Sequence, residues 1–191
     1  MTTDTRRPWI EVGYDLFAQH GPSGLKVEVI ARRVGKSKSS FYHHFADLEV
    51  FTEVLLTYHS EQINVIAEQE RLCRAVVPDL VNLLLTYKQD LLFNRQLRVY
   101  RHISAFQQCI KQSTKQVGEA ILPIWADMLG LPDNSALAQV VLNLSLENFY
   151  LQITEETLTY DWLVGYLDEL KQMVNAFQHN EIRRTLLYGS V

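Results

Sequence analysis

Residues 30–45 read Ile-Ala-Arg-Arg-Val-Gly-Lys-Ser-Lys-Ser-Ser-Phe-Tyr-His-His-Phe, and this stretch decides the fold of the N-terminal third. Its small residues fall where two helices meet at a tight turn, since Ala31 allows a close helix crossing and Gly35 can adopt a positive φ angle. Phe41 and Phe45 lie on one face of the second helix, where they can pack against the first. The pattern predicts a helix-turn-helix.

The exposed side and entry turn of the second helix are rich in hydrogen-bond donors. Such donors contact the phosphates and base edges of DNA. Adjacent histidines point about 100° apart on a helix, so phosphate contact suits this pair better than a shared ion, and no metal site is predicted. The predicted DNA contacts here are Lys36, Ser37, Lys38, Ser39, Ser40, Tyr42, His43 and His44.

Residues 37–45 resemble the recognition segment of the TetR family of bacterial transcriptional regulators, which commonly reads Ser-x-Gly/Ser-Thr/Ser-hydrophobic-Tyr-x-His-Phe. The resemblance reaches back through residues 16–21 and covers about the first third of the chain. Lys26 stands where the family commonly places a capping Ser or Thr, Lys36 replaces a common turn valine, and Leu48 stands where a phosphate-contacting Lys is frequent. We expect Lys26 and Lys36 to add phosphate contacts and Leu48 to remove one.

Length and composition indicate a packed helical protein. The chain has 191 residues, 47% of them hydrophobic, with only 8 Gly and 5 Pro, which excludes a disordered chain. No apolar run has the length of a membrane span, and the N-terminus lacks the apolar segment of a signal peptide, so we expect a cytoplasmic protein. Cys73 and Cys109 are too few for a disulfide framework or a zinc site.

Charge is unevenly distributed along the chain. The net charge is −4, but residues 1–45 hold seven basic and four acidic residues, a balance of +3. The remaining residues therefore carry −7. A basic segment joined to an acidic one is typical of a small nucleic-acid reader attached to a domain that does not touch DNA.

The whole chain shows helical periodicity and no strand alternation, which predicts an all-α fold. We expect an N-terminal three-helix helix-turn-helix domain, residues 1–46, followed by a helical ligand-binding and dimerisation domain, residues 47–191. Pro123 should kink or break its helix. The predicted helices cover 8–20, 26–34, 37–45, a long segment from 47, 76–93, 96–111, 113–128, 135–155 and 161–179, with a short helical tail to 187.

The helix over residues 135–155 is apolar around most of its circumference, so it must be covered on two sides. TetR-like proteins pair through their last two helices, and the resemblance implies a homodimer here too. The alternative is that both helices are buried within one monomer. The predicted interface residues are Leu142, Phe149, Trp162, Tyr166 and Leu170.

Aromatic and polar residues recur along helices that should face one another, and TetR-like proteins enclose a small molecule among such helices. Ordinary core packing is the alternative for each of them. Asn148 is the leading candidate because a buried amide on an apolar face needs partners that a ligand could supply. The predicted ligand contacts are Tyr87, His102, Phe106, Trp125 and Asn148.

Together with these patterns, the resemblance to the TetR family implies a ligand-responsive transcriptional repressor. It would bind double-stranded DNA at a palindromic operator as a homodimer and be released by a small hydrophobic effector. No catalytic motif is present, so we expect neither enzymatic activity nor a cofactor. Two alternatives are a helical small-molecule binding protein that no longer reads DNA and a helical enzyme with an unrecognised site.

Overall fold

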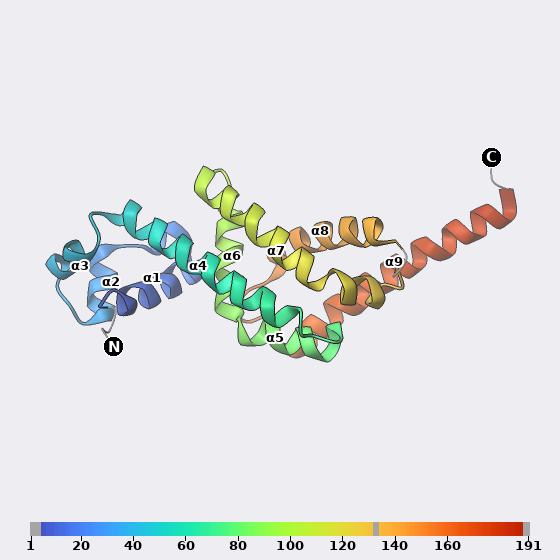
Figure 1. The fold of residues 1–191 in the computed structure, drawn as a ribbon, viewed down its shortest axis with the longest axis horizontal. Coiled ribbons are helices and arrows are strands. Elements are labelled where there is room, and N and C mark those ends of the chain that lie inside the picture. The colour runs from blue at the N-terminus through green and yellow to red at the C-terminus, as the bar shows by residue number, and fades with distance from the viewer. Residues whose placement is uncertain (1–4, 132–133, 189–191) are drawn as a thin grey trace. The chain divides into compact units, whose positions relative to one another are not determined.

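The computed structural model describes residues 5–131 and 134–188, with the side chains of all of these except 135 and 179–188. Over these residues the chain forms nine α-helices, two short helical turns and no strand, which confirms the all-α prediction (Figure 1). No described helix is long and apolar enough to cross a membrane. The elements are α1 (Arg7–His20), η1 (Gly21–Gly24), α2 (Val27–Val34), α3 (Lys38–His44), α4 (Leu48–Glu70), η2 (Val76–Leu80), α5 (Val81–Thr86), α6 (Lys88–Val99), α7 (Ser104–Met128), α8 (Ser135–Gln152) and α9 (Tyr160–Tyr188).

Local sequence signals explain where the N-terminal helices begin. Pro8 lies in the first turn of α1, where its missing N–H costs no hydrogen bond. The Ser37 hydroxyl caps α3 by accepting the backbone N–H of Ser40 at 3.2 Å. Asp47 precedes α4, and its carboxylate accepts the N–H of Val50 at 2.8 Å. Ser37 and Asp47 thus each satisfy a backbone N–H in the first turn of the helix that follows.

The chain folds into two compact units. One combines the chain up to Ala67 with Tyr87–Val117, and the other combines Glu68–Thr86 with the chain from Gly118 onward. The chain therefore passes from one unit to the other three times, within α4, between α5 and α6, and within α7. The helix-turn-helix thus shares a compact unit with α1, α6 and parts of α4 and α7. The functional boundary at residues 46 and 47 stays a prediction.

Aromatic rings build the core of the first unit. Phe17 of α1 stacks on Phe93 of α6 with ring centroids 4.3 Å apart, and Tyr14 stacks on the same ring at 4.3 Å. Gly13 lies where α1 crosses α4, because a Cβ at this position would clash with the Phe51 ring. These contacts hold α1 against α4 and α6.

The second unit packs α5 against α9. Gly118 of α7 lies close to α8, where a Cβ would be 3.4 Å from the Gln139 side-chain nitrogen. Phe149 of α8 meets two aromatic rings of α9, with centroids 6.0 Å from Trp162 and 5.8 Å from Tyr166. The predicted interface aromatics therefore contact one another within a single chain.

The middle of the chain departs from the predicted helices. The single helix expected over 76–93 is divided into η2, α5 and the start of α6, with a break at Tyr87. The expected helices 96–111 and 113–128 are also wrong, because α6 ends at Val99 and α7 runs unbroken from Ser104 to Met128. Pro123 lies within α7 without ending it.

Candidate functional site

The turn between α2 and α3 depends on the backbone conformation of Gly35. This residue has φ 71° and ψ 32°, in the left-handed region. A Cβ added there would meet nothing within 4 Å, so glycine is required by the backbone angle and not by lack of space. The N–H of Lys36 closes the end of α2 on the Ala31 carbonyl at 2.9 Å. The predicted helix-turn-helix is confirmed at this level.

Buried aromatics beneath α3 fix its position. Phe41 and Phe45 are almost fully buried, and their ring centroids lie 5.2 Å and 4.7 Å from that of Phe51 on α4. Trp9 of α1 meets Phe41 edge-on at 5.7 Å. Two helices, α1 and α4, thus hold α3 in place through these rings, while Tyr42 on α3 stays exposed to solvent.

The structure gathers most predicted DNA contacts on this solvent side. Tyr42 is 56% exposed, although it is a large aromatic residue. Ser40 and His44 are only half-buried, and the Ser40 hydroxyl lies 3.1 Å from that of Ser37. Lys26 precedes α2 without capping it by a side-chain hydrogen bond. The exposed members of the predicted set are Lys26, Lys36, Ser37, Lys38, Ser39, Tyr42 and His43.

An ion pair at this surface was missed by sequence reasoning. The Lys38 ammonium lies 2.8 Å from a carboxylate oxygen of Glu28 on α2, and both side chains are mostly exposed. The hydrogen bond from Lys38 lowers the pKa of Glu28, and the same bond raises the pKa of Lys38. Ten residues separate the two, so helical spacing gave no signal for this pair. An anion that binds Lys38 would have to displace Glu28 from it.

Leu48, the third departure from the TetR pattern, is half-buried and packs against the first unit's core. A leucine there adds apolar contact where a lysine would have offered a charge. The replacement therefore has a packing role in this structure.

The predicted ligand contacts do not gather at one place. Phe106 belongs to the core of the first unit, where its ring centroid lies 5.6 Å from that of Phe17. Tyr87 is half-buried in the same unit and His102 is exposed. Trp125 is buried in the second unit, and its indole nitrogen has no hydrogen-bond partner.

Asn148 corrects one expectation. The sequence predicts a buried amide here, but the Asn148 side chain is exposed and accepts a hydrogen bond from Gln152 at 2.5 Å. Leu144 and Leu151, which lie one turn before and after Asn148, are exposed as well, so this face of α8 is an outer surface.

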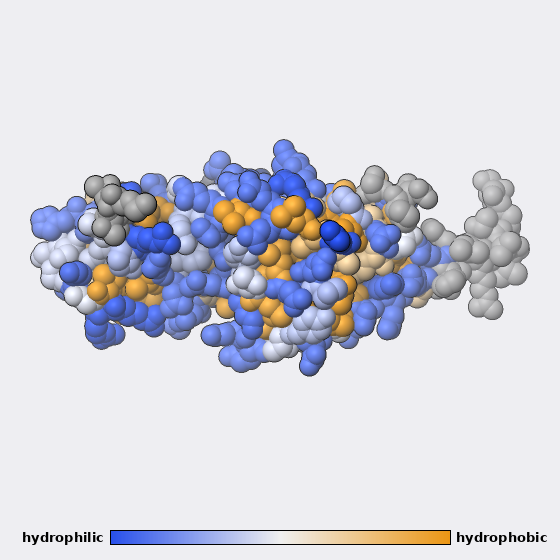
Figure 2. Space-filling view, turned by 60° about the horizontal axis from the view of Figure 1, so that its bottom comes forward, coloured by the Kyte–Doolittle hydropathy of each residue, from blue (hydrophilic) through white to orange (hydrophobic). Residues whose placement is uncertain are grey.

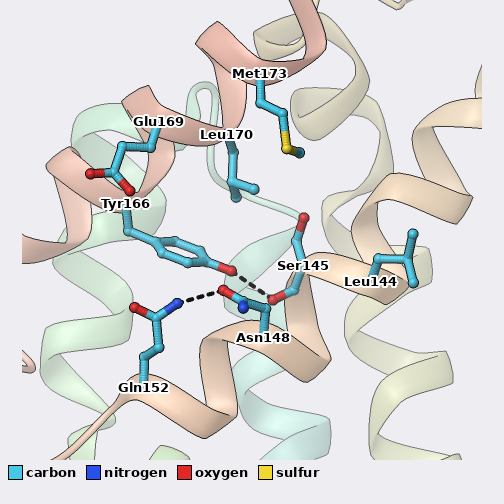
Figure 3. A pocket seen from close by; sticks show the side chains of 8 residues that line it. All are labelled: Leu144, Ser145, Asn148, Gln152, Tyr166, Glu169, Leu170 and Met173. Atoms are coloured by element: carbon cyan, nitrogen blue, oxygen red, sulfur yellow. Dashed lines mark hydrogen bonds between the residues drawn. The ribbon is translucent and has the colours of Figure 1, made fainter. Parts of the chain in front are cut away.

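Asn148 does line a groove of about 340 Å³ between α8 and α9. Tyr166 and Leu170 point from α9 toward α8, and the Tyr166 hydroxyl donates to the Ser145 carbonyl at 2.7 Å (Figure 3). Burial raises the pKa of Tyr166 to about 12. The groove is lined by Leu144, Ser145, Asn148, Gln152, Tyr166, Glu169, Leu170 and Met173.

The predicted interface residues divide into two groups. Leu142 and Phe149 are buried within the second unit, whereas Trp162, Tyr166 and Leu170 are half-buried. Apolar residues gather in the middle of the face drawn in Figure 2, with hydrophilic residues around them. The large apolar residues that α8 and α9 expose are Leu137, Val140, Leu144, Leu151, Tyr160, Met173 and Phe177.

Comparison with known families identifies the N-terminal segment. Residues 10–49 match the family model described as bacterial regulatory proteins, tetR family. These residues are a TetR-family DNA-binding domain. The matched segment contains α2, the Gly35 turn and α3, together with most of α1, so it coincides with the helix-turn-helix seen in the structure.

Solved structures share the TetR-like fold over most of the chain. A transcriptional regulator from Rhodococcus sp. Rha1 is 14% identical with a TM-score of 0.62, covering 89% of this chain and 95% of that one. A TerR/AcrR-family regulator from Aquifex aeolicus VF5 is 17% identical with a TM-score of 0.59, covering 91% and 99%. A TetR-family regulator from Bordetella parapertussis 12822 is 21% identical with a TM-score of 0.57, covering 90% and 94%.

No curated protein matches the chain. The family match and the helix-turn-helix geometry therefore carry the functional assignment. They show a TetR-family DNA-binding domain at residues 10–49 within a chain of TetR-like fold.

Proposed function

We propose that the protein is a homodimeric repressor that binds a palindromic operator and is released by a small hydrophobic effector. The observation that carries this proposal is the exposed donor surface of α3, held by Phe41 and Phe45 within a TetR-family domain. Lys36, Lys38 and Tyr42 supply groups for phosphates and base edges. Because it acts on a bacterial chromosome, the protein works in the cytoplasm.

The exposed surface of α8 and α9 supports the homodimer. Leu144 and Leu151 are 69% and 78% exposed on α8, and Phe177 is 67% exposed on α9. Apolar side chains exposed together on one helix pair favour contact with another protein surface. The groove beside Asn148 would receive side chains of the second copy.

The effector site belongs to the second unit in this proposal. Trp125 supports it, because a buried indole N–H without a partner offers a hydrogen bond to a bound molecule. A largely hydrophobic effector with one or two hydrogen-bonding groups would suit such surroundings. Of the other predicted ligand contacts, Tyr87, His102 and Phe106 belong to the first unit and Asn148 is exposed on α8, so Trp125 alone represents the predicted set in this proposed site.

The proposal is tested by incubating the purified protein with sheared genomic DNA and sequencing the fragments that it retains. Binding to a retained fragment is then measured by fluorescence anisotropy over a salt series for the wild type, Tyr42→Ala and Lys38→Ala. We expect both variants to bind more weakly while helicity is kept. Loss of one lysine–phosphate contact should reduce the salt slope by about 1.

Unchanged affinity in both variants would exclude α3 as the reading helix. Failure of the wild type to retain any fragment would favour a helical small-molecule binding protein. Chemical turnover of a compound bound in the second unit would instead favour an enzyme.

A further inference from the structure

A chain of buried polar side chains runs through the first unit. The Tyr14 hydroxyl of α1 lies 2.6 Å from Nδ1 of His59 on α4 and donates to a carboxylate oxygen of Asp90 on α6 at 2.8 Å. The amide nitrogen of Asn94, also on α6, lies 3.5 Å from Nε2 of His59 and donates to the Ser113 hydroxyl of α7 at 3.2 Å. Four helices are joined by these side chains.

The direction of each hydrogen bond follows from the number of protons available. Tyr14 has one hydroxyl proton, which goes to Asp90, so Nδ1 of His59 must carry the proton directed at the Tyr14 oxygen. Nε2 of His59 is then free to accept from Asn94. This arrangement requires a neutral imidazole, and burial lowers the pKa of His59 to about 3. The chain of donors thus ends on the Asp90 carboxylate.

Most of the hydrogen-bonded residues lie on the helices through which the polypeptide enters and leaves the first unit. The chain enters or leaves the first unit three times, through α4, at the start of α6, and through α7. His59, Asp90 and Ser113 each lie on one of these three helices. Tyr14 lies on α1, which carries the aromatic support of α3 through Trp9.

Breaking the Tyr14 link would be costly. Tyr14, His59 and Asn94 are almost fully buried, and Asp90 is nearly so. A buried group that loses its partner retains its desolvation penalty, which is larger for a charged group. Tyr14 and Asp90 are therefore expected to move together when α6 is displaced.

We propose that Tyr14 is a positioning residue that couples the three helices arriving from the second unit to the DNA-reading helices. This inference rests on the proposed ligand-responsive function. A displacement of α6 that follows a change in the second unit reaches α1 through the Tyr14–Asp90 hydrogen bond. Coupling of this kind is reciprocal, so DNA bound at α3 also changes the stability of α6.

The experiment is hydrogen–deuterium exchange of the full chain with and without a genomic DNA fragment that it retains. In the wild type, DNA should raise amide protection in both α3 and α6. In Tyr14→Phe, DNA should still protect the amides of α3. The DNA-induced change in the amide-opening equilibrium constant of α6 should be smaller than in the wild type by roughly 10- to 150-fold, which is the equivalent of one hydrogen bond to a charged group. Tyr58→Phe is the matched control, because it removes a hydroxyl from a half-buried ring that packs edge-on against Tyr14 at 5.1 Å.

A conservative variant separates coupling from a purely structural role. Asp90→Asn keeps an oxygen that can accept from Tyr14, so it should retain most of the α6 response, whereas Asp90→Leu should lose it. Urea unfolding also compares the double variant with Tyr14→Phe and Asp90→Leu. The effect of the double variant on the unfolding equilibrium constant should differ from the product of the two single effects by at least about tenfold. Additive effects would overturn the inference.

The outcomes distinguish the two proposals. If the wild type retains DNA and Tyr14→Phe keeps the full α6 response, the coupling role of Tyr14 is wrong while the DNA-binding function stands. If the wild type retains no DNA, the proposed function falls and the inference falls with it.

Discussion

Gly35 shows how one residue fixes the geometry of the DNA-binding turn. Its φ of 71° is unfavourable for any residue with a Cβ, while its surroundings leave room for one. We expect Gly35→Ala to lower the free energy of unfolding by about 1–2 kcal/mol through backbone strain alone. Urea unfolding followed by circular dichroism measures this change.

Gly165→Ala is the matched control. Gly165 lies within α9, and a Cβ there would also meet nothing within 4 Å. Alanine is preferred to glycine in a helix, so this variant should gain about 0.5–1 kcal/mol. Effects of the same sign in the two variants would contradict the role assigned to Gly35.

Glu70 predicts a pH dependence of stability. It is 2% exposed at the end of α4, one of its carboxylate oxygens has no hydrogen-bond partner, and burial raises its pKa to about 7 from an ordinary value of 4.5. Between these values the folded state binds more protons than the unfolded state, so the free energy of unfolding falls as pH rises. The full loss, about 3 kcal/mol, is reached above pH 7.

Glu70→Gln should therefore be more stable than the wild type at pH 8 and similar to it at pH 5, as measured by urea unfolding. His59 titrates in the opposite direction, since its pKa of about 3 makes stability rise with pH up to its ordinary value of 6.5. That contribution is shared by both proteins and cancels in the comparison. Glu68→Gln, an exposed change on the same helix, should show no such crossover.

At the scale of elements, the ion pair between α2 and α3 sets the availability of Lys38. Glu28 pairs with the Lys38 ammonium group, which we propose binds a DNA phosphate. Glu28→Gln should therefore bind a retained DNA fragment a few-fold more tightly, because Lys38 no longer exchanges one anionic partner for another. Anisotropy titration measures the change. Glu61→Gln removes the same charge from an exposed site on α4 and is expected to have a smaller effect.

The sequence predicted the first four helices well because each has a signal at its boundary. Pro8, Gly35, Ser37 and Asp47 mark helix ends by their own backbone or capping chemistry. Most of the predicted DNA contacts are exposed at α3 and the turn before it, as their polar side chains indicate. The Lys38–Glu28 pair was missed because it joins two elements.

The middle of the chain lacked such signals. No Gly or Pro marks the break at Tyr87 or the end of α6 at Tyr100. The apolar periodicity continues through both positions, so the sequence predicts helix at each of them. The sequence predicts a helix start at Ser113, but this residue lies within α7, where its hydroxyl donates to the Ile110 carbonyl and accepts from Asn94. Its role depends on tertiary contact, which a single sequence does not display.

At the scale of the whole molecule, the structure changes which residues should test the homodimer. Leu142 is 1% exposed, so a charge there would unfold the second unit instead of only separating two subunits. Leu144 is a better probe because it is 69% exposed on α8 and lines the groove. The sequence predicts which helices carry the interface, and the structure shows which of their side chains are exposed.

Leu144→Glu should convert a dimer into monomers while preserving helicity, because it places a charge in an apolar contact without disturbing the core. Sedimentation equilibrium measures the mass, and anisotropy should show weaker binding to DNA, since a monomer reads one half-site of a two-fold symmetric operator. Leu72→Glu is the control, because Leu72 is 79% exposed outside α8 and α9 and should leave the mass unchanged. A monomeric wild type at micromolar concentration, or retained DNA without two-fold symmetry, would contradict the homodimer.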